Sequence, residues 1–299
     1  MNRLNHKNKT IMIVAGEASG DMHGAGLVRE MLKADPALNF YGIGGKKMQA
    51  AGVQILADAS AMAVVGFTEV FSKLRVILKI MRRMKKSLDE RHPDLVILID
   101  YPDFNLPLAK AARKRGIRVL YYISPQVWAW RRGRIEQIKK TVTQMAVILP
   151  FEVETYRQKG FTVNYVGHPL LDMVKTNYAL KESRKKSGLD ESKTTIAILP
   201  GSRLSEIKKL MPELLKAAAI LKNKIPEMQF VIPLADTLEE KDLTDMMTGS
   251  RLDVKVISGH TYDVVACADL ALVASGTATL ETALLKIPMI IVYKISLLS

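Results

Sequence analysis

Short apolar runs of strand length alternate with helical patterns along almost the whole chain. The runs lack the in–out alternation of a strand that has one face in water, so we expect parallel sheets covered by helices on both faces. Strict alternation of strand and helix predicts an α/β fold of βαβ units in doubly wound, Rossmann-like sheets. The expected strands are residues 11–16, 39–43, 94–100, 118–124, 144–150, 196–200, 229–235, 254–259, 270–274 and 289–293.

A polar and charged segment, residues 175–194, interrupts this pattern and divides the chain into two halves. We place the domain boundary at Pro169, so that residues 1–168 form one Rossmann-like domain and residues 169–299 form a second. Ligands of doubly wound sheets bind beyond the carboxyl ends of the strands. Two such domains that face each other form a cleft, so the candidate functional residues are those that directly follow strands.

The segment from residue 69 to residue 90 is a long amphipathic pattern with a broad apolar side. Its apolar stripe is Val70, Leu74, Ile77, Met81, Met84 and Leu88, and its opposite face carries Arg75, Lys79, Arg82, Arg83 and Lys86. The apolar surface is extended by Val65, Phe67, Phe71 and Leu78. A broad apolar arc opposite a basic face is typical of a helix in a membrane interface. A deeply packed helix with solvated lysines gives the same pattern, so both interpretations stay open.

Composition narrows the class of protein. The formal net charge is +14, from 44 Lys and Arg against 30 Asp and Glu, which favours binding to phosphates of nucleic acids, anionic lipids or nucleotides. No apolar run approaches the roughly 20 residues of a membrane span. Cys267 is the only cysteine and the five histidines show no ligand spacing, so we expect a cytoplasmic protein with no disulfide and no metal. The glycines after the first strand are not spaced G-x-G-x-x-G, which disfavours a nicotinamide or flavin cofactor.

The first candidate phosphate site follows an expected strand in the second half, in the sequence L-P-G-S-R. Gly201 and Ser202 place free backbone N–H groups at the start of a helix, and Arg203 adds a fixed cation. An ordinary strand-to-helix turn with Ser202 as the helix cap is the alternative.

A second helix start follows another strand of the same half, in the sequence A-S-G-T-A-T-L-E. Ser275, Gly276 and Thr277 would supply its backbone N–H groups, and two such helix starts suit a diphosphate better than one. Glu281 lies one turn into this helix, where it could accept hydrogen bonds from a ribose diol. A carboxylate that merely complements the helix dipole is the alternative.

The loop after the first strand reads G-E-A-S-G-D and is rich in small and acidic residues. Glu17, Ser19 and Asp21 lie together in a tight turn that suits a polar, uncharged sugar, with Gly16 and Gly20 beside them. We therefore consider this loop a candidate acceptor site, with a capped turn as the alternative.

The most apolar strand of the first half ends in L-I-D-Y-P-D-F-N. Asp100 directly follows that strand, and a carboxylate in such a position is a candidate general base. Asp103 is better placed to cap the next helix. Further along, Trp128 and Arg131 follow another strand and could stack on a sugar and contact a phosphate, or could simply pack.

Taken together, these motifs resemble those of one family, the bacterial lipid-A-disaccharide synthases. The shared motifs are A-G-E-A-S-G-D at 15–21, D-Y-P-D-F-N at 100–105, S-P-Q-V-W-A-W-R at 124–131, L-P-F-E at 149–152, V-G-H-P at 166–169, L-P-G-S-R at 199–203 and A-S-G-T-A-T-L-E at 274–281. They are ordered over nearly the whole chain, which makes the resemblance specific.

The resemblance implies a GT-B glycosyltransferase at the cytoplasmic face of the inner membrane. Such enzymes transfer 2,3-diacylglucosamine from UDP to the 6-hydroxyl of 2,3-diacylglucosamine 1-phosphate, and form a β-1,6 disaccharide with inversion and without a metal. The two helix starts would then hold the leaving diphosphate. Glu281 would hold the uridine ribose, and the basic apolar helix would contact the lipid surface.

The chain departs from the family pattern where it ends, in V-Y-K-I-S-L-L-S after the last expected strand. Family members continue for several helices and a strand and can be homodimers, so we expect the second domain to be incomplete. Three other functions stay open. A UDP-sugar epimerase would share the architecture but need no lipid contact, a noncatalytic truncated product would keep only the fold, and a nucleic-acid-binding protein would explain the charge without a recognised module.

Overall fold

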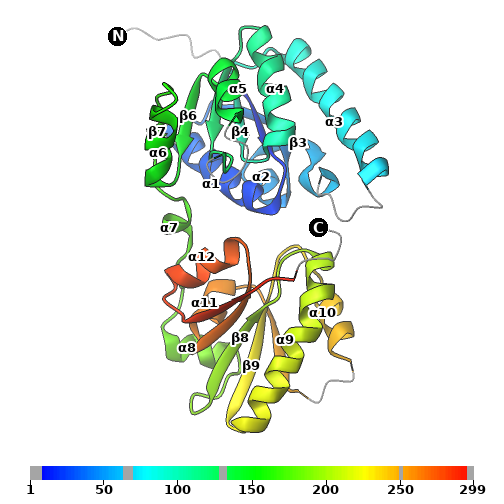
Figure 1. Cartoon of the computed structure of the whole chain (residues 1–299), viewed down its shortest axis with the longest axis vertical. Helices are drawn as coiled ribbons and strands as arrows, with labels where there is room; N and C mark the ends of the chain where they lie inside the picture. The colour runs from blue at the N-terminus through cyan, green and yellow to red at the C-terminus, as the bar shows by residue number, and fades with distance from the viewer. Residues whose placement is uncertain (1–8, 63–69, 128–132, 249–251, 295–299) are drawn as a thin grey trace. The chain divides into compact units, whose positions relative to one another are not determined.

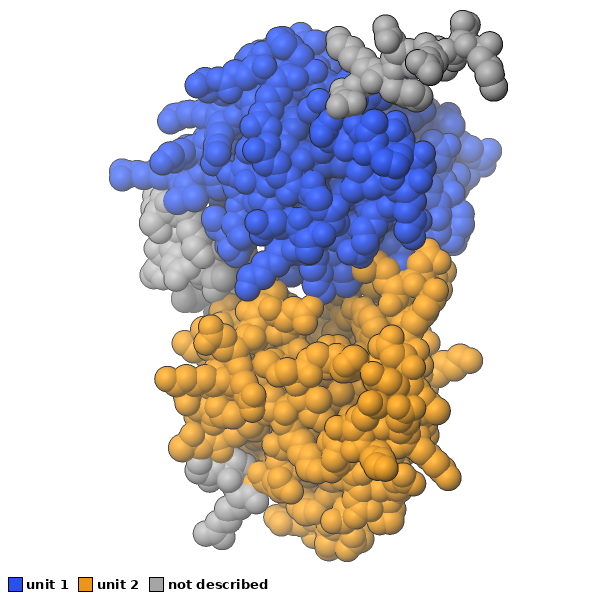
Figure 2. Space-filling view, turned by 180° about the vertical axis from the view of Figure 1, so that it is seen from behind, with its two compact units in different colours: residues 1–169 blue, residues 170–299 orange. Residues whose placement is uncertain are grey.

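The computed structural model describes residues 9–62, 70–127, 133–248 and 252–294, although not the side chains of residues 70–73. The chain folds into two compact units, Met1–Pro169 and Leu170–Ser299 (Figure 2). This division lies one residue from the boundary expected from the sequence.

Unit 1 contains a seven-stranded parallel sheet in the order β3-β2-β1-β4-β5-β6-β7 (Figure 1). Its strands are β1 (Thr10–Ala15), β2 (Asn39–Gly44), β3 (Val53–Asp58), β4 (Leu95–Ile99), β5 (Arg118–Tyr122), β6 (Gln144–Val147) and β7 (Asn164–Tyr165). We did not expect β3 and β7, which form the two edges. An edge strand is paired on one side and less covered, so it needs no continuous apolar run.

Helices cover both faces of this sheet, and alternate residues of each strand serve opposite faces. Ile11 and Ile13 of β1 pack in one hydrophobic cluster with α1 and α2, whereas Met12 and Val14 pack in another with α3, α4 and α5 (Figure 1). The helical elements of unit 1 are α1 (Ala18–Ala34), α2 (Lys46–Ala50), the 3₁₀ turn η1 (Ala59–Met62), α3 (Val70–Arg91), α4 (Pro102–Lys114), α5 (Arg134–Thr141) and α6 (Pro150–Arg157). Apolar residues on both sides of each strand explain why the sequence shows no alternation.

Unit 2 contains a five-stranded parallel sheet in the order β10-β9-β8-β11-β12. The strands are β8 (Thr194–Leu199), β9 (Met228–Leu234), β10 (Val254–Ser258), β11 (Leu270–Ala274) and β12 (Met289–Val292). One hydrophobic cluster joins the sheet to α9 and α10, and the other joins it to α11, with α12 packed against it. The helices are α7 (Leu170–Met173), α8 (Leu180–Lys186), α9 (Leu204–Lys224), α10 (Glu240–Met247), α11 (Thr261–Ala266) and α12 (Thr277–Leu284).

The polar segment that divides the sequence pattern belongs to unit 2. Asp263 of α11 is buried and accepts hydrogen bonds from the backbone N–H groups of Asn177 and Tyr178, at 2.7 and 3.0 Å, and from the Asn177 side chain at 2.8 Å. Burial opposes the charge of this carboxylate, but those hydrogen bonds outweigh it and hold the pKa of Asp263 below its usual value. The segment is therefore anchored by the buried acid Asp263 as well as by its own Leu189, which is buried in a hydrophobic cluster of unit 2.

Strand order reverses direction once in each sheet. Strand order reverses between β1 and β4 in unit 1 and between β8 and β11 in unit 2. Loops that leave two adjacent strands in opposite directions open a crevice at their carboxyl ends, which is where doubly wound proteins bind ligands. The candidate loops after β1, β4, β8 and β11 lie at these two points.

Candidate functional site

In unit 2 the two expected phosphate-binding loops are direct neighbours. Gly201 follows β8 with φ of +117°, a conformation that favours glycine. A Cβ atom added there would lie 3.0 Å from Glu206 Oε2 and 3.9 Å from the Cβ atom of Ala274, the last residue of β11. The Thr237 hydroxyl, in the loop after β9, donates to the Ser202 carbonyl oxygen at 2.6 Å. The start of α9 is therefore held beside the end of β11.

Both helix starts keep their first backbone N–H groups clear of a side-chain cap. Helix α9 begins after Arg203 and α12 begins after Gly276, and in this described part of the chain neither capping residue supplies a side-chain hydrogen bond. The alternative in which Ser202 caps α9 is therefore wrong. Arg203 forms an ion pair with Glu206 at 3.0 Å. Two adjacent, uncapped helix starts suit an anion with more than one phosphate.

Glu281 has a partner that we did not expect from the sequence. The hydroxyl of Tyr262, on α11, donates a hydrogen bond to Glu281 Oε1 at 2.9 Å. Burial and then the Glu281 carboxylate raise the pKa of Tyr262 well above its usual value, so the hydroxyl stays protonated. The carboxylate thus lies half-buried on α12, one turn beyond the helix start.

In unit 1, Asp100 directly follows β4 and has a strained backbone conformation. Asp100 and Tyr101 have φ of 42° and 45°, in the left-handed region that non-glycine residues rarely adopt. The carbonyl oxygen of Asp100 accepts hydrogen bonds from the Asn105 side chain at 2.7 Å and from the Tyr121 hydroxyl at 2.6 Å. Asn105 and Tyr121 are both buried, so their hydrogen bonds keep the Asp100 backbone in this strained conformation. Strained residues of this kind cluster at functional sites.

Asp100 and Glu17 lie at the same edge of the sheet, as expected. Strands β1 and β4 pair in parallel with Ala15 beside Ile99, and the two acids follow these strands. Burial and then the Glu17 carboxylate raise the pKa of Asp100 to about 6. A carboxyl group with this pKa is poised to accept a proton near neutral pH.

The two glycines beside Glu17 and Ser19 allow close packing. Gly16 makes room for the ring of Tyr101, because an added Cβ atom would lie 2.5 Å from it. Gly20 lets α1 approach β1, with only 3.2 Å between an added Cβ atom and that of Ala15. Ser19 is half-buried in the first turn of α1.

Asp21 is a correction to the expected acceptor site. Its buried carboxylate accepts hydrogen bonds from the backbone N–H groups of Gly45, Lys47 and Met48, at 2.6, 3.1 and 3.0 Å. It therefore stabilises the start of α2, where the helix has unsatisfied N–H groups, and is turned into the protein rather than toward a sugar.

Asp103 is a second correction. It lies in the first turn of α4, whose capping residue is Tyr101, and no side-chain cap is made there among the described residues. Its exposed carboxylate forms an ion pair with Arg134 of α5 instead. Asp103 thus joins two helices at the surface.

Two further motifs also have structural roles. Glu152 of L-P-F-E is buried and accepts hydrogen bonds from the N–H groups of Ile148 and Leu149, at 3.3 and 2.9 Å, which caps α6. His168 of V-G-H-P packs its ring edge-on against His23 of α1, with 6.3 Å between ring centroids. Trp128 and Arg131 lie outside the described residues.

Helix α3 divides into a packed half and an exposed half. Met81, Met84 and Leu88 of the apolar stripe are buried, and so is Ile80 beside them, but Leu74, Val76 and Leu78 are 47%, 41% and 46% exposed. Leu74 belongs to the apolar stripe but is not part of the core, so the packed-helix interpretation does not hold there. Arg75 and Lys79 are exposed on the same stretch. Val65 and Phe67, and the side chain of Phe71, lie outside the described residues. Among the described helices, none is long and apolar enough to cross a membrane.

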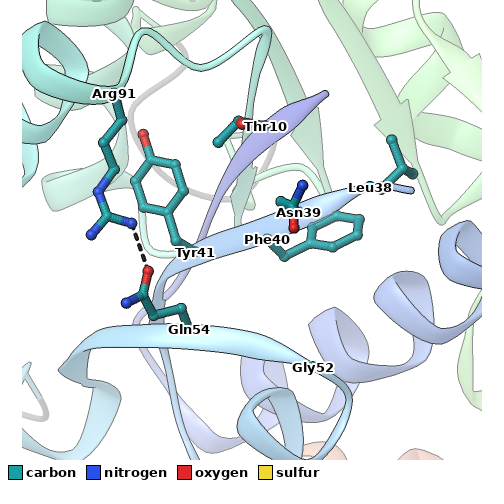
Figure 3. A pocket seen from close by; sticks show the side chains of 8 residues that line it. All are labelled: Thr10, Leu38, Asn39, Phe40, Tyr41, Gly52, Gln54 and Arg91. Atoms are coloured by element: carbon teal, nitrogen blue, oxygen red, sulfur yellow. Dashed lines mark hydrogen bonds between the residues drawn. The ribbon is translucent and has the colours of Figure 1, made fainter. Parts of the chain in front are cut away.

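A hollow in unit 1 lies away from these loops (Figure 3). It is lined by Thr10, Leu38, Asn39, Phe40, Tyr41, Gly52, Gln54 and Arg91. Arg91 lies 4.7 Å from the centroid of the Tyr41 ring and donates to Gln54 Oε1 at 2.6 Å (Figure 3). Thr10 and Asn39 begin their strands, so the hollow lies at the amino end of the sheet, opposite Asp100.

Known proteins resemble the chain over nearly its whole length. The model of the family described as lipid-A-disaccharide synthetase matches residues 11–299. The chain is 57% identical over 293 residues to the lipid-A-disaccharide synthase of Syntrophus aciditrophicus (strain SB), which covers 98% of this chain and 76% of that protein. The chain belongs to the lipid-A-disaccharide synthase family.

Another lipid-A-disaccharide synthase, from Nitrosococcus oceani, is 52% identical over 289 residues, covering 97% of this chain and 75% of that protein. The resemblance inferred from the motifs is therefore confirmed. Lipid-A-disaccharide synthases are glycosyltransferases, so the chain is a glycosyltransferase that serves the synthesis of the lipid A disaccharide.

Solved structures confirm the GT-B fold expected for a lipid-A-disaccharide synthase. A UDP-bound structure of MnaA from S. aureus superimposes with a TM-score of 0.67 at 14% identity, covering 96% of this chain and 80% of that one. The UDP-GlcNAc 2-epimerase of Neisseria meningitidis, bound to UDP-GlcNAc, gives 0.64 at 13% identity, covering 94% and 82%. At such identities the likeness shows the fold alone.

Proposed function

We propose that this lipid-A-disaccharide synthase transfers 2,3-diacylglucosamine from UDP to 2,3-diacylglucosamine 1-phosphate. The products are the β-1,6-linked disaccharide 1-phosphate and UDP, and the anomeric configuration is inverted. Unit 2 binds the nucleotide of the donor, and unit 1 supplies the base that acts on the acceptor.

The observation that carries this proposal is the pair of uncapped helix starts in unit 2. The first N–H groups of α9 and α12 lie at the point where strand order reverses, behind Gly201 and Gly276. As the glycosidic bond to UDP breaks, negative charge accumulates on the diphosphate. Fixed N–H dipoles that point at this charge stabilise it more in the transition state than in the ground state. Ser202, Arg203, Ser275 and Thr277 belong to these two loops.

Glu281 holds the ribose of the same nucleotide in this proposal. It lies one helical turn, about 6 Å, beyond the start of α12. A carboxylate accepts hydrogen bonds from both hydroxyl groups of a diol and thereby distinguishes ribose from deoxyribose.

Asp100 acts as the general base. The acceptor hydroxyl must lose its proton as it attacks the anomeric carbon, and a base is most effective when its pKa is close to the working pH. The pKa of about 6 leaves Asp100 ionised at neutral pH but still basic. Glu17 shapes this pKa and, with Ser19, faces the acceptor sugar. Trp128 and Arg131 stay predictions for the same site.

A membrane surface is the partner that the exposed half of α3 favours. Leu74, Val76 and Leu78 are too exposed for core residues, and Arg75 and Lys79 lie among them. An apolar surface with flanking cations binds an anionic bilayer from one side. We therefore place the enzyme peripherally on the cytoplasmic face of the inner membrane, where its acylated substrates are found. Homodimer formation stays a prediction from the family.

Product analysis tests the reaction directly. The chain, incubated with UDP-2,3-diacylglucosamine and the 1-phosphate acceptor in detergent, should release UDP and form one disaccharide 1-phosphate, identified by mass spectrometry. A UDP-sugar epimerase, the alternative function on the same architecture, would yield an isomer of the donor. An isomerised donor without any disaccharide would overturn the proposed transfer.

A further inference from the structure

Tyr262 and Glu281 form a hydrogen bond between two helices of unit 2. Tyr262 is the second residue of α11, directly beyond β10, and Glu281 lies on α12. The 2.9 Å bond joins the tyrosine hydroxyl to Oε1 of the carboxylate in a partly buried place. The two residues are 19 positions apart and lie on different helices, so the contact does not come from the hydrogen bonding within one helix.

The hydroxyl is not needed to hold α11 in the fold. Val264 and Val265 of the same helix are buried in the hydrophobic cluster below. Asp263 is bound by the backbone of Asn177 and Tyr178. Since these neighbours already fix α11, the tyrosine hydroxyl is left with one evident effect, which is on Glu281.

The Tyr262 hydroxyl fixes the conformation of the Glu281 side chain, which is a hydrogen-bond acceptor. A free glutamate side chain loses rotamer entropy when it is fixed. A donor that fixes it before the ligand arrives removes part of this cost from binding. A carboxylate has about four acceptor positions, so it can bind Tyr262 and a diol together. The tyrosine remains a donor at neutral pH, because burial and the Glu281 charge raise its pKa.

We propose that Tyr262 is a positioning residue that orients the Glu281 carboxylate for the ribose diol of the donor nucleotide. It thereby sets the preference of unit 2 for ribonucleotides. This inference rests on the proposed function, specifically on a uridine nucleotide at the starts of α9 and α12.

The test compares UDP with 2′,3′-dideoxyuridine 5′-diphosphate, which lacks both ribose hydroxyl groups. Dissociation constants of both ligands are measured by calorimetry for the wild-type chain and for Tyr262→Phe. The wild type should prefer UDP by roughly 5–150-fold. In Tyr262→Phe this preference should fall roughly three- to tenfold, with the dideoxy ligand bound as before. In the Glu281→Gln background the same substitution should change UDP affinity far less, because the two residues act as one unit.

Tyr178→Phe is the matched control. Tyr178 lies in the same unit, and its ring contacts with His260 and Lys186 survive the loss of the hydroxyl. It should keep the wild-type preference. Tyr262→Phe that retains the full preference overturns the role of Tyr262 alone, and so does its failure to fold, as seen by circular dichroism. A wild-type chain that binds both ligands equally overturns the ribose site itself, and the positioning role with it.

Discussion

The two loop pairs at the points of strand reversal share a topology but offer opposite chemistry. In unit 2 the loops after β8 and β11 present backbone N–H donors from small residues at two helix starts. In unit 1 the loops after β1 and β4 present the carboxylates of Glu17 and Asp100. Donors suit an anion, whereas carboxylates suit neutral hydroxyl groups.

The backbone also differs between the two pairs. The turn after β8 relieves its unusual conformation by using glycine, at Gly201. The turn after β4 keeps Asp100 and Tyr101 left-handed and holds them with Asn105 and Tyr121. A position that needs only a backbone N–H can be glycine, but a position that needs a base must keep its side chain and bear the strain. In the proposed function, the phosphate loop therefore needs no strained side-chain-bearing residue, whereas the loop of the base does.

The largest effect should come from removing the base. Asp100→Asn should lower turnover by roughly 10²–10⁴-fold, because no base then removes the proton from the attacking sugar hydroxyl. UDP affinity should be nearly unchanged, since unit 2 is untouched. Asparagine also tolerates the left-handed conformation, so the loop should survive. Steady-state kinetics and calorimetry on one preparation measure both. Near-normal turnover in Asp100→Asn, with Glu17→Gln inactive, would move the base to Glu17.

A smaller effect, a loss of UDP affinity, is expected when Glu281 is changed. Glu281→Ala should weaken UDP binding by about 1–3 kcal/mol, roughly 5–150-fold, through lost hydrogen bonds to the ribose. Calorimetric titration with UDP measures it. Glu213→Ala, which removes an exposed carboxylate of α9 paired with Lys294, is the control and should bind UDP as the wild type does. Equal affinities in the Glu281 and Glu213 variants would exclude a ribose role for Glu281.

The pH dependence of the reaction should show the ionisation of Asp100 through a smaller effect, a fall in kcat/KM at low pH. The base must be ionised, and its pKa is raised to about 6. The value of kcat/KM should therefore fall as the pH drops through 6, to about one tenth of its plateau at pH 5. Folding stability should change in the opposite sense. The folded protein favours the protonated acid, so this contribution is complete below the unfolded pKa and is lost as the pH rises through 6. A rate that does not fall between pH 7 and pH 5 would rule out Asp100 as the titrating base.

The surface of α3 should have a still smaller effect. Changing Leu74, Val76 and Leu78 to Ser should reduce co-sedimentation with anionic vesicles by about three- to tenfold, since each lost apolar side chain weakens insertion. The same change at Ile220 and Ile225, which are exposed on and beside α9 of unit 2, is the control and should leave vesicle binding intact. Unfolding of the α3 variant would instead show that these residues pack against part of the protein.

Much of the fold could be predicted because burial on both faces leaves a signal in every central strand. The edge strands β3 and β7 were not predicted, because an edge strand needs fewer apolar residues than a central one. The two helix starts after β8 and β11 were also predictable, because small residues between an apolar run and a helical pattern mark such a turn.

The acids were harder to assign. Asp21 and Asp100 both follow strands, yet Asp21 is occupied by the backbone of α2, more than 20 residues away. The partner of Glu281, Tyr262, lies on another helix. Such contacts depend on tertiary packing, which neither spacing nor periodicity records. The direction in which a carboxylate points is therefore the part of a site that sequence patterns leave undetermined.

The smallest effect on turnover is expected for Asp103, three residues after Asp100. The Asp103 side chain is 75% exposed and pairs with Arg134, which is mostly buried. An exposed ion pair contributes about 0–1 kcal/mol, and a carboxylate in the first turn of a helix adds a similar amount at most. Asp103→Asn should therefore lower the free energy of unfolding by about 1 kcal/mol or less, and added salt should shrink the difference. Chemical denaturation at low and high salt measures this. Turnover should stay within about twofold of the wild type, because a side chain that is turned to α5 takes no part in proton transfer. If instead Asp103→Asn abolishes turnover and Asp100→Asn does not, the strained turn after β4 serves to present Asp103, and the base has been assigned to the wrong end of that turn.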